Sequence, residues 1–195
     1  MIENQTFSLD EVEVGAVYKN CQFTYSSEII HVSDVTFERC EFQNQEFQRS
    51  EWLDCTFKDI IFSNLSFSES VFYRCRFEHC QLLGTNFIDN RWKETRISDS
   101  RCDYINFSES VLEKCFFENA SLKEAYFQSL TVKKSLVFDS CQLEQADFLG
   151  TKLATIDFSK SEFENIVFSP NLLKGAIISH YQAAQMIGML GVKIK

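Results

Sequence analysis

The feature that most constrains this chain is a large, mostly apolar residue at every fifth position over most of its length. The series runs without a break from Val32 to Val132, and after a shift of one residue it resumes at Phe138 and ends at Ile178. Seventeen of the 20 phenylalanines follow this period, and the other three are Phe7, Phe23 and Phe116. A period of five matches neither a helical turn nor the two-residue alternation of a strand. It indicates a chain that turns a corner after every five residues.

The position two residues before each large residue is usually small or apolar, as at Cys55, Ser70 and Ala125. Two of every five side chains are therefore expected to point inward, and four such sides close a square coil of 20 residues. Successive coils would stack at about the 4.8 Å spacing of β-strands. Residues 20 positions apart then form columns, for example the one from Phe47 to Phe127. We predict an all-β solenoid over residues 32–178.

The two ends of the chain are expected to close this solenoid, because exposed end coils need caps. Residues 1–31 are predicted to form an N-terminal capping coil, in which Cys21 precedes Phe23 by two positions, and then a loop at residues 24–31. Residues 179–195 are predicted to form a short α-helix and a terminal strand. Ser179 is a candidate N-cap for a helix over residues 180–190, with Gly191 as its left-handed stop. The terminal strand is suggested by the alternation of Val192, Lys193, Ile194 and Lys195.

One face of the predicted C-terminal helix is apolar. It carries Tyr181, Ala184, Ile187 and Leu190 at spacings of three residues. This face can pack on the last coil or on a second copy of the chain. We favour the second copy, because a dimer would also cover the exposed edge of the last coil.

Composition excludes several classes of protein. The chain has 28 acidic and 19 basic residues, a formal net charge of −9, and this balance argues against direct binding to nucleic acid. The N-terminus is neither basic nor followed by an apolar run, so no signal peptide is expected, and no stretch is long and apolar enough for a transmembrane helix. We therefore expect a cytoplasmic protein that is not bound to a membrane.

The eight cysteines all fall at inward positions of the five-residue period, where cysteine serves as a small apolar side chain. No Cys-x-x-Cys pair occurs, and the histidines His31, His79 and His180 lie far apart in sequence. Neither a metal site nor a disulfide is expected. No phosphate-binding loop or known nucleophile motif is present, and the convex outside of a solenoid offers no closed cleft. We expect a protein without catalytic residues, cofactor or metal.

Function must then lie in the outward residues and the ends. Glu69, Asp89 and Glu109 stand 20 residues apart and are expected to form one acidic column. A second set, at 40-residue intervals on another edge, consists of Glu38, Glu78 and Glu118. Columns of carboxylates on a rod can imitate the charge of a nucleic-acid backbone. The alternative interpretation is a solvated acidic face that only keeps the fold soluble. The basic residues Arg91, Arg96 and Arg101 interrupt this pattern.

The five-residue period with its small inward position resembles the pentapeptide-repeat family, whose consensus is A(D/N)LXX, and the resemblance covers about residues 32–178. Residues 105–115 are similar to the NFSxxVLEKC stretch of the Qnr quinolone-resistance proteins. The tail, from Gly175 through Tyr181-Gln182-Ala183 to Leu190-Gly191-Val192, resembles the Qnr signature GxxxxxxYQAxxxxxxLG(I/V). Residues 168–171 and the Phe-rich body are most similar to chromosomal Gram-positive members, such as the enterococcal one.

This resemblance implies a right-handed quadrilateral β-helix and a homodimer joined through the C-terminal ends. The residues it carries over to the dimer interface are Tyr181, Ile187, Leu190, Val192 and Ile194. It further implies a DNA-mimicking rod that binds DNA gyrase, with topoisomerase IV as a second candidate, and so modulates quinolone susceptibility. The assignment of the acidic columns to the gyrase-facing surface comes from their charge and not from a family motif.

One departure bears on function. Many plasmid-borne Qnr proteins have two projecting loops associated with protection, whereas here only residues 24–31 and one extra residue within 133–137 interrupt the period. This leaves gyrase inhibition as an alternative to protection. A structural scaffold for an unrelated cytosolic partner is the alternative from another functional class.

Overall fold

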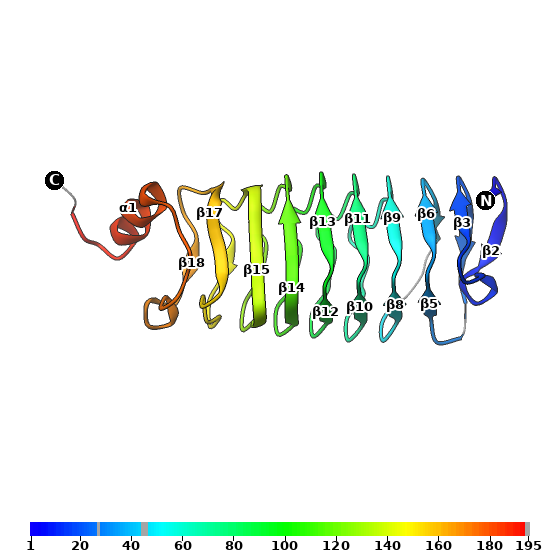
Figure 1. Cartoon of the computed structure of the whole chain (residues 1–195), viewed down its shortest axis with the longest axis horizontal. Helices are drawn as coiled ribbons and strands as arrows, with labels where there is room; N and C mark the ends of the chain where they lie inside the picture. Colours follow the sequence, from blue (N-terminus) through cyan, green and yellow to red (C-terminus); the bar gives the residue numbers. More distant parts are fainter. Residues whose placement is uncertain (27, 44–46, 194–195) are drawn as a thin grey trace.

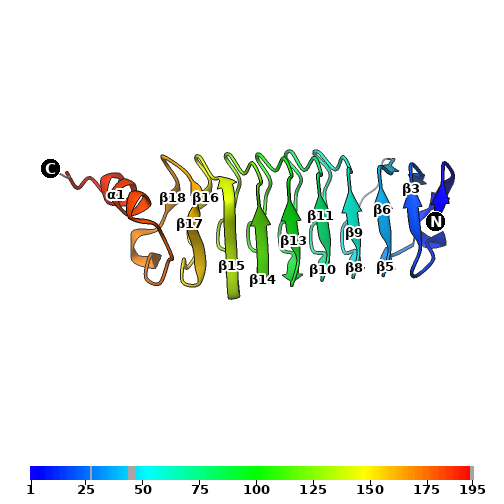
Figure 2. The same cartoon turned by 45° about the horizontal axis from the view of Figure 1, so that its top comes forward.

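The computed structural model, which describes residues 1–26, 28–43 and 47–193, is a rod of stacked four-sided coils with one helix at its C-terminal end (Figure 1). Strands of successive coils pair in parallel and 20 residues apart through the middle of the rod, as in the pairing of Phe72 with Trp52 and Trp92. The view turned by 45° shows the same strands side by side, with α1 beyond the last of them (Figure 2). The predicted all-β solenoid is confirmed.

Two adjacent sides of the coil form one continuous parallel sheet. The first side consists of β5 (His31–Ser33), β8 (Glu51–Leu53), β10 (Val71–Tyr73), β12 (Arg91–Lys93) and the first parts of β14 (Val111–Glu118) and β15 (Thr131–Gln142). The second side consists of β1 (Ile2–Glu3), β3 (Val17–Lys19), β6 (Thr36–Glu38), β9 (Thr56–Lys58), β11 (Arg76–Glu78), β13 (Arg96–Ser98), the later parts of β14 and β15, and the start of β17 (Ile156–Glu162).

The other two sides are held by shorter pairings. The third side has β2 (Thr6–Ser8), β4 (Gln22–Thr24) and β7 (Glu41–Phe42), followed by single bridged residues from Ile61 to Gln142. The fourth side has bridged residues from Ser66 to Asp147, and then β16 (Asp147–Phe148) and β18 (Val167–Phe168). Two 3-10 turns, Leu9–Glu11 and Pro170–Leu172, and the helix α1 (His180–Met189) complete the elements.

The core consists of vertical columns of large side chains, as the period predicts. Phe47, Phe67 and Phe87 are fully buried, and their rings stack with centroid separations of 4.4 Å and 5.2 Å. Nearly every member of the five-residue series is buried, and the half-buried ones lie where a coil borders a break or an end of the rod. These are Phe42, Val132, Phe168, Leu173 and Ile178.

The columns also extend further toward the N-terminus than the five-residue count reveals. Tyr18 pairs with Phe37 at a spacing of 19 residues, and Ile2 pairs with Tyr18 at a spacing of 16. Phe23 stacks in the same way between Phe7 and Phe42. Because these coils are shorter than 20 residues, a search for a fixed period does not detect them.

The predicted one-residue shift is confirmed in β15. Its pairing with β14 changes register between Glu113 and Cys115. Cys115 lies opposite Leu136, and Phe138 resumes the column next to Phe117. The extra residue is accommodated around Lys134, whose φ is +69°. Such a bulge lets the ladder continue on both sides.

The tail helix is also confirmed. Ser179 caps α1 by accepting a hydrogen bond from the Gln182 N–H, and Gly191 follows the helix with a φ of +81°. The predicted terminal strand is not found at Val192 and Lys193, which belong to no strand. Ile194 and Lys195 lie outside the described residues.

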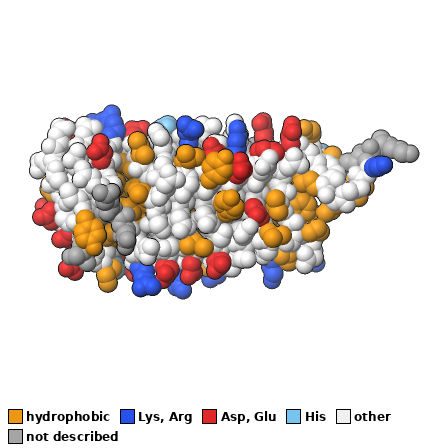
Figure 3. Space-filling view, turned by 180° about the vertical axis from the view of Figure 1, so that it is seen from behind, with side chains coloured by type: hydrophobic (Ala, Val, Ile, Leu, Met, Phe, Trp, Pro, Cys, Tyr) orange, Lys and Arg blue, Asp and Glu red, His pale blue; other side chains and the backbone are white. Residues whose placement is uncertain are grey.

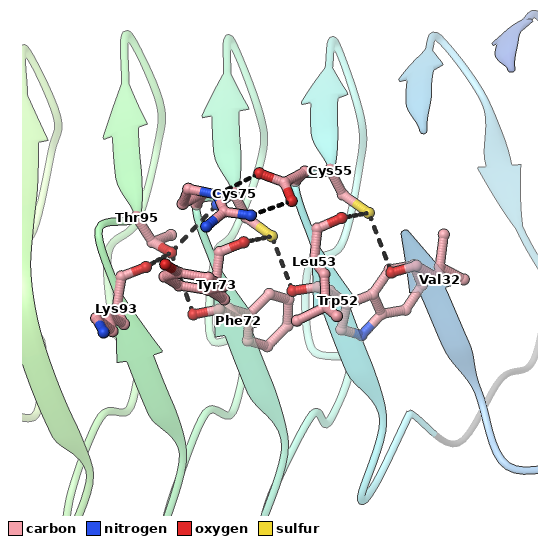
Figure 4. Close-up of polar contacts among 11 residues, drawn as sticks. Val32, Trp52, Leu53, Cys55, Phe72, Tyr73, Cys75, Lys93 and Thr95 are labelled. Carbon is pink, nitrogen blue, oxygen red and sulfur yellow. Dashed lines mark hydrogen bonds and ion pairs between the residues drawn. The ribbon is translucent and has the colours of Figure 1, made fainter. Parts of the chain in front are cut away.

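The inward position that precedes each large residue forms a second set of bonds inside the coil. Cys55 Sγ donates to the Val32 carbonyl at 3.5 Å, and one coil further Cys75 Sγ donates to the Trp52 carbonyl at 3.2 Å (Figure 4). Serine, threonine and asparagine make the same contact elsewhere, for example Thr85 with the Phe62 carbonyl. All eight cysteines are buried and free, as predicted. Most of these inward polar side chains thus tie one coil to the coil before it.

These buried thiols make stability sensitive to alkaline pH. Burial raises the pKa of Cys80 to about 12 and that of Cys115 to about 12, whereas an unfolded thiol ionises near 8.5. Because the folded pKa is raised, the stabilisation is complete below pH 8.5 and is lost as the pH rises toward 12. We expect each of the two thiols to lower the free energy of unfolding by about 2 kcal/mol at pH 10.

Urea unfolding at pH 8 and pH 10 measures this loss. In the Cys80→Ala/Cys115→Ala double variant the pH dependence should be weaker, and alanine is accommodated at the equivalent positions Ala120 and Ala125. An unchanged pH dependence in the double variant would show that these thiols are not its source.

Candidate interaction surface

The outward corners of the coil share one backbone geometry. At the described positions from Asp34 to Thr155, the residue two positions after a large residue has a left-handed φ, for example +58° at Glu69, +53° at Asp89 and +64° at Glu109. This conformation costs most side chains about 1–2 kcal/mol, and Asn and Asp tolerate it best. Its signal in the sequence is the frequent Asn or Asp at these positions, among them Asn20, Asp34, Asp54, Asp59, Asn64, Asp99 and Asn119.

Three of the predicted site residues form the expected column, which we call the acidic corner: Glu69, Asp89 and Glu109. The amide of Glu69 donates to the Ile88 carbonyl at 3.0 Å, and that of Asp89 donates to the Ser108 carbonyl at 3.0 Å. Successive carboxylates are therefore fixed one coil apart and all are exposed. Arg49 stands at the N-terminal end of the column and pairs with Glu69 at 2.9 Å. Asp89 and Glu109 form no ion pair with the other described residues.

The second predicted set lies in one column but not in an acidic one. Lys58 pairs in register with both Glu38 and Glu78, and Ser98 lies between Glu78 and Glu118. Arg39 contacts Glu38 at 2.7 Å, and Arg96 contacts Glu118 at 2.9 Å. This edge therefore carries a mixed ladder of charge. A 40-residue interval passes over every second coil, so it does not reveal the intervening Lys58 and Ser98.

Mixed charge is common elsewhere on the surface. Acidic and basic side chains intermingle along both long margins of the rod when it is seen from behind (Figure 3). Arg74 bonds Asp54 from the next coil, and Lys114 bonds Glu94 at 2.9 Å. These hydrogen bonds lower the pKa of Asp54 and of Glu94. Exposed pairs of this kind contribute little stability, but they remove local charge.

The net charge is unevenly distributed along the rod. Residues 1–69 contain 13 acidic and four basic residues, a net charge of −9. Residues 70–101 contain six basic and four acidic residues, and residues 102–195 contain 11 acidic and nine basic residues. The excess negative charge of the chain is therefore that of its N-terminal third, and the middle of the rod is slightly positive.

The C-terminal end presents an apolar surface. Of the predicted interface residues, Tyr181 is 71% exposed, Ile187 42%, Leu190 46% and Val192 54%. Ile194 lies outside the described residues. Hydrophobic side chains gather toward this end in the view from behind (Figure 3). The apolar face of α1 is therefore turned away from the coil that the helix caps.

The opposite face of α1 is anchored by Gln182, which the sequence analysis did not single out. Its Nε2 donates to the carbonyls of Phe158 at 2.7 Å and Ser161 at 2.8 Å, and the residue is only 2% exposed. One coil earlier, Ser161 makes the same contact with the Phe138 carbonyl. Gln182 thus makes the contact that the inward polar residue of a further coil would make. Its position 21 residues after Ser161 was the available signal.

The surface contains shallow hollows, two of which have volumes of about 660 and 640 Å³. No group of three or more His, Cys, Asp or Glu side chains in the described ranges is arranged to hold a metal ion. Among the same residues, no helix has the length and apolar character needed to cross a bilayer.

The role of Gln182 can be tested by replacing it with a side chain of similar size that cannot donate. Gln182→Met leaves the Phe158 and Ser161 carbonyls without their donor, and we expect the free energy of unfolding to fall by about 1–3 kcal/mol. Gln185→Met is the matched control, since the Gln185 Oε1 has no partner. Equal effects of the two substitutions in urea unfolding would contradict the anchoring role.

One family model and several solved structures are similar to this chain. The family described as "Pentapeptide repeat region" matches residues 70–137. The solved structure of full-length QnrB1, a plasmid-mediated fluoroquinolone resistance protein, is 16% identical over 98% of this chain and 97% of that chain, with a TM-score of 0.47. HetL, a pentapeptide repeat protein involved in heterocyst differentiation regulation in the cyanobacterium Nostoc, is 15% identical over 91% of this chain and 83% of that chain, with a TM-score of 0.45.

No curated protein sequence matches the chain significantly. The family match covers the most regular part of the rod, and the same columns of buried side chains continue beyond it in both directions. Residues 70–137, which match this family model, form the centre of a parallel β-helix.

Proposed function

We propose that this protein acts as a cytoplasmic DNA mimic that binds DNA gyrase, with topoisomerase IV as a second candidate, and thereby modulates quinolone susceptibility. Two lines of argument support the proposal: the similarity of residues 105–115 and of the tail to Qnr proteins, and the charge of the rod. Residues 168–171 and the Phe-rich body further support a placement near the chromosomal Gram-positive members of that group. The proposal assigns no catalytic step to the chain.

The charge density of the N-terminal third carries the physical argument. Four strands, β1, β3, β6 and β9, stack through this part on the second side of the coil, which at about 4.8 Å per strand occupies roughly 15–20 Å of the axis. A net charge of −9 over this length is one charge per roughly 2 Å. Duplex DNA has about one negative charge per 1.7 Å. A basic surface that holds DNA would therefore meet a comparable field here.

The acidic corner continues this surface into the middle of the rod. The backbone that carries its carboxylates is already ordered by the β-ladder, so less entropy is lost on binding than with the same side chains on a flexible loop. Attraction between such a surface and a basic partner weakens as salt increases.

We also propose that the protein is a homodimer joined through its C-terminal ends. The exposed apolar residues of α1 and Val192 lie at that end, and a second copy would bury them symmetrically. Two acidic N-terminal thirds would then lie at the far ends of one long rod.

A scaffold for an unrelated cytosolic partner is the second candidate function. The observation that favours it is the mixed charge of the middle of the rod, where Lys58 separates Glu38 from Glu78 and residues 70–101 carry a positive excess. A rod that imitated DNA along its whole length would not need these basic residues.

The gyrase hypothesis is tested with a triple charge reversal at the acidic corner, Glu69→Lys/Asp89→Lys/Glu109→Lys. Lysine is accommodated in the same left-handed conformation at Lys114 and Lys134, so the fold should be retained. We expect the affinity for purified gyrase to fall at least tenfold, because three carboxylates that would face a basic surface become cations. A supercoiling assay with and without ciprofloxacin then reports the functional consequence.

The matched control is Glu124→Lys/Glu162→Lys/Glu164→Lys, which makes the same change in net charge at exposed positions nearer the C-terminus. Equal affinities of the two triple variants would show that the acidic corner is not the contact surface. Restored supercoiling with the drug would indicate protection, and inhibition in both conditions would indicate a mimic without protection. No effect of the unmodified protein on gyrase would favour the scaffold.

The dimer is tested separately with Leu190→Asp. A carboxylate at this exposed apolar position should disfavour burial against a second copy, and light scattering should report a monomer. The core does not depend on Leu190, which is 46% exposed, so thermal unfolding should change little. A dimer that persists in this variant would rule out the proposed interface.

A further inference from the structure

The first side of the coil contains a hollow whose lining residues have a net positive charge. It has a volume of about 660 Å³ and lies over β10, β12 and the start of β14. Its floor includes the half-buried side chains of Val71, Tyr73 and Val111, and its rim includes the basic residues Arg91, Lys93 and Lys133. We call this feature the basic hollow. It lies within the part of the rod that has a positive excess of charge.

The β-ladder places cations beside apolar residues in this hollow. Arg91 lies in register between Val71 and Val111. Lys93 lies in register beside Tyr73, with its Nζ 5.2 Å from the centre of the tyrosine ring, and the two side chains come from neighbouring strands (Figure 4). Arg74 covers the same ring at 4.0 Å. Tyr73 is therefore held between two cations.

The rim cations are only partly balanced by neighbouring carboxylates of the described residues. Arg91, Lys93 and Lys133 have no ion pair among the described residues, whereas the neighbouring Arg74 and Lys114 are paired with Asp54 and Glu94. Glu113, in register between Lys93 and Lys133, is the acidic side chain among the residues that line the hollow. A local excess of unpaired positive charge beside apolar surface indicates an anionic partner with apolar groups.

The width of the hollow restricts the kind of anion. The columns of Arg91 and Lys93 are two residues apart along the strand, which is about 7 Å. Asp89 of the acidic corner precedes Arg91 by two residues, and Glu94 follows Lys93 directly. A duplex nucleic acid is wider than the hollow and would contact these carboxylates on both margins. A single extended polypeptide is narrow enough to avoid them.

We propose that the basic hollow binds an extended acidic segment of a partner protein, in which carboxylates alternate with apolar side chains. The carboxylates contact Arg91, Lys93 and Lys133, and the apolar side chains lie on Val71, Tyr73 and Val111. This site is separate from the acidic surface of the proposed function and opposite to it in charge. One rod can therefore hold a basic partner on its acidic surface and an acidic segment on its first side.

The test uses a fluorescently labelled peptide in which glutamate alternates with leucine, measured by anisotropy with the full chain. We expect saturable binding that weakens as salt increases, and a loss of about tenfold in affinity in either Arg91→Glu or Lys93→Glu. Glutamate is accommodated at both places, because Glu51 and Glu113 occupy the same columns. Lys123→Glu, on the third side of the coil, is the control with the same change in charge.

Three results would overturn the proposal. These are absence of saturable binding, equal loss of affinity in the Lys123→Glu control, and equal binding of a peptide that alternates lysine with leucine. Tighter binding of a labelled duplex oligonucleotide would assign the hollow to nucleic acid instead. If the particle mass increased with protein concentration and Lys93→Glu abolished this increase, the hollow would instead be a contact with a second copy of the chain. The gyrase assay does not bear on any of these results, so the two proposals fail independently.

Discussion

The stacking of each coil on the one before it is the interaction on which the rest of the molecule depends. Every coil repeats the same three contacts: a large ring on a large ring, an inward thiol or hydroxyl on a carbonyl of the preceding coil, and backbone bonds at the corners. Each coil contacts only its neighbours, so stability is built up along one direction. Because a shift of the register by one residue would move the large side chains outward, these contacts define the position of each surface side chain.

The surface charge follows from this register. Two residues of each five point inward, and the remaining three are free to vary, so each outward column has its own composition. The acidic corner, the mixed ladder of Glu38, Lys58 and Glu78, and the basic hollow are three columns or pairs of columns on one regular frame. A solenoid can therefore present surfaces of opposite charge within a few ångströms without strain in its core.

The ends of the rod differ because the repeat stops there. At the C-terminus, Gln182 satisfies the carbonyls that a further coil would have used, and Tyr181 and Ile187 of α1 face outward with Leu190. A helix that capped the coil and had no other role would not need exposed side chains at Ile187 and Leu190. At the N-terminus, Phe7, Tyr18 and Phe23 continue the columns in coils shorter than 20 residues.

The five-residue period by itself determined the fold, the inward and outward positions, the burial of all eight cysteines and the shift near Lys134. It could do so because each property depends on residues close in sequence or at a constant interval. Which charged residues stand next to one another in an outward column could be determined only from the tertiary structure. A 40-residue interval relates Glu38 to Glu78 but omits Lys58 between them, and the short N-terminal coils do not follow a constant interval.

The ion pairs, the basic hollow and the anchoring of Gln182 were decided only by the tertiary structure, since each brings together side chains about 20 residues apart on neighbouring coils.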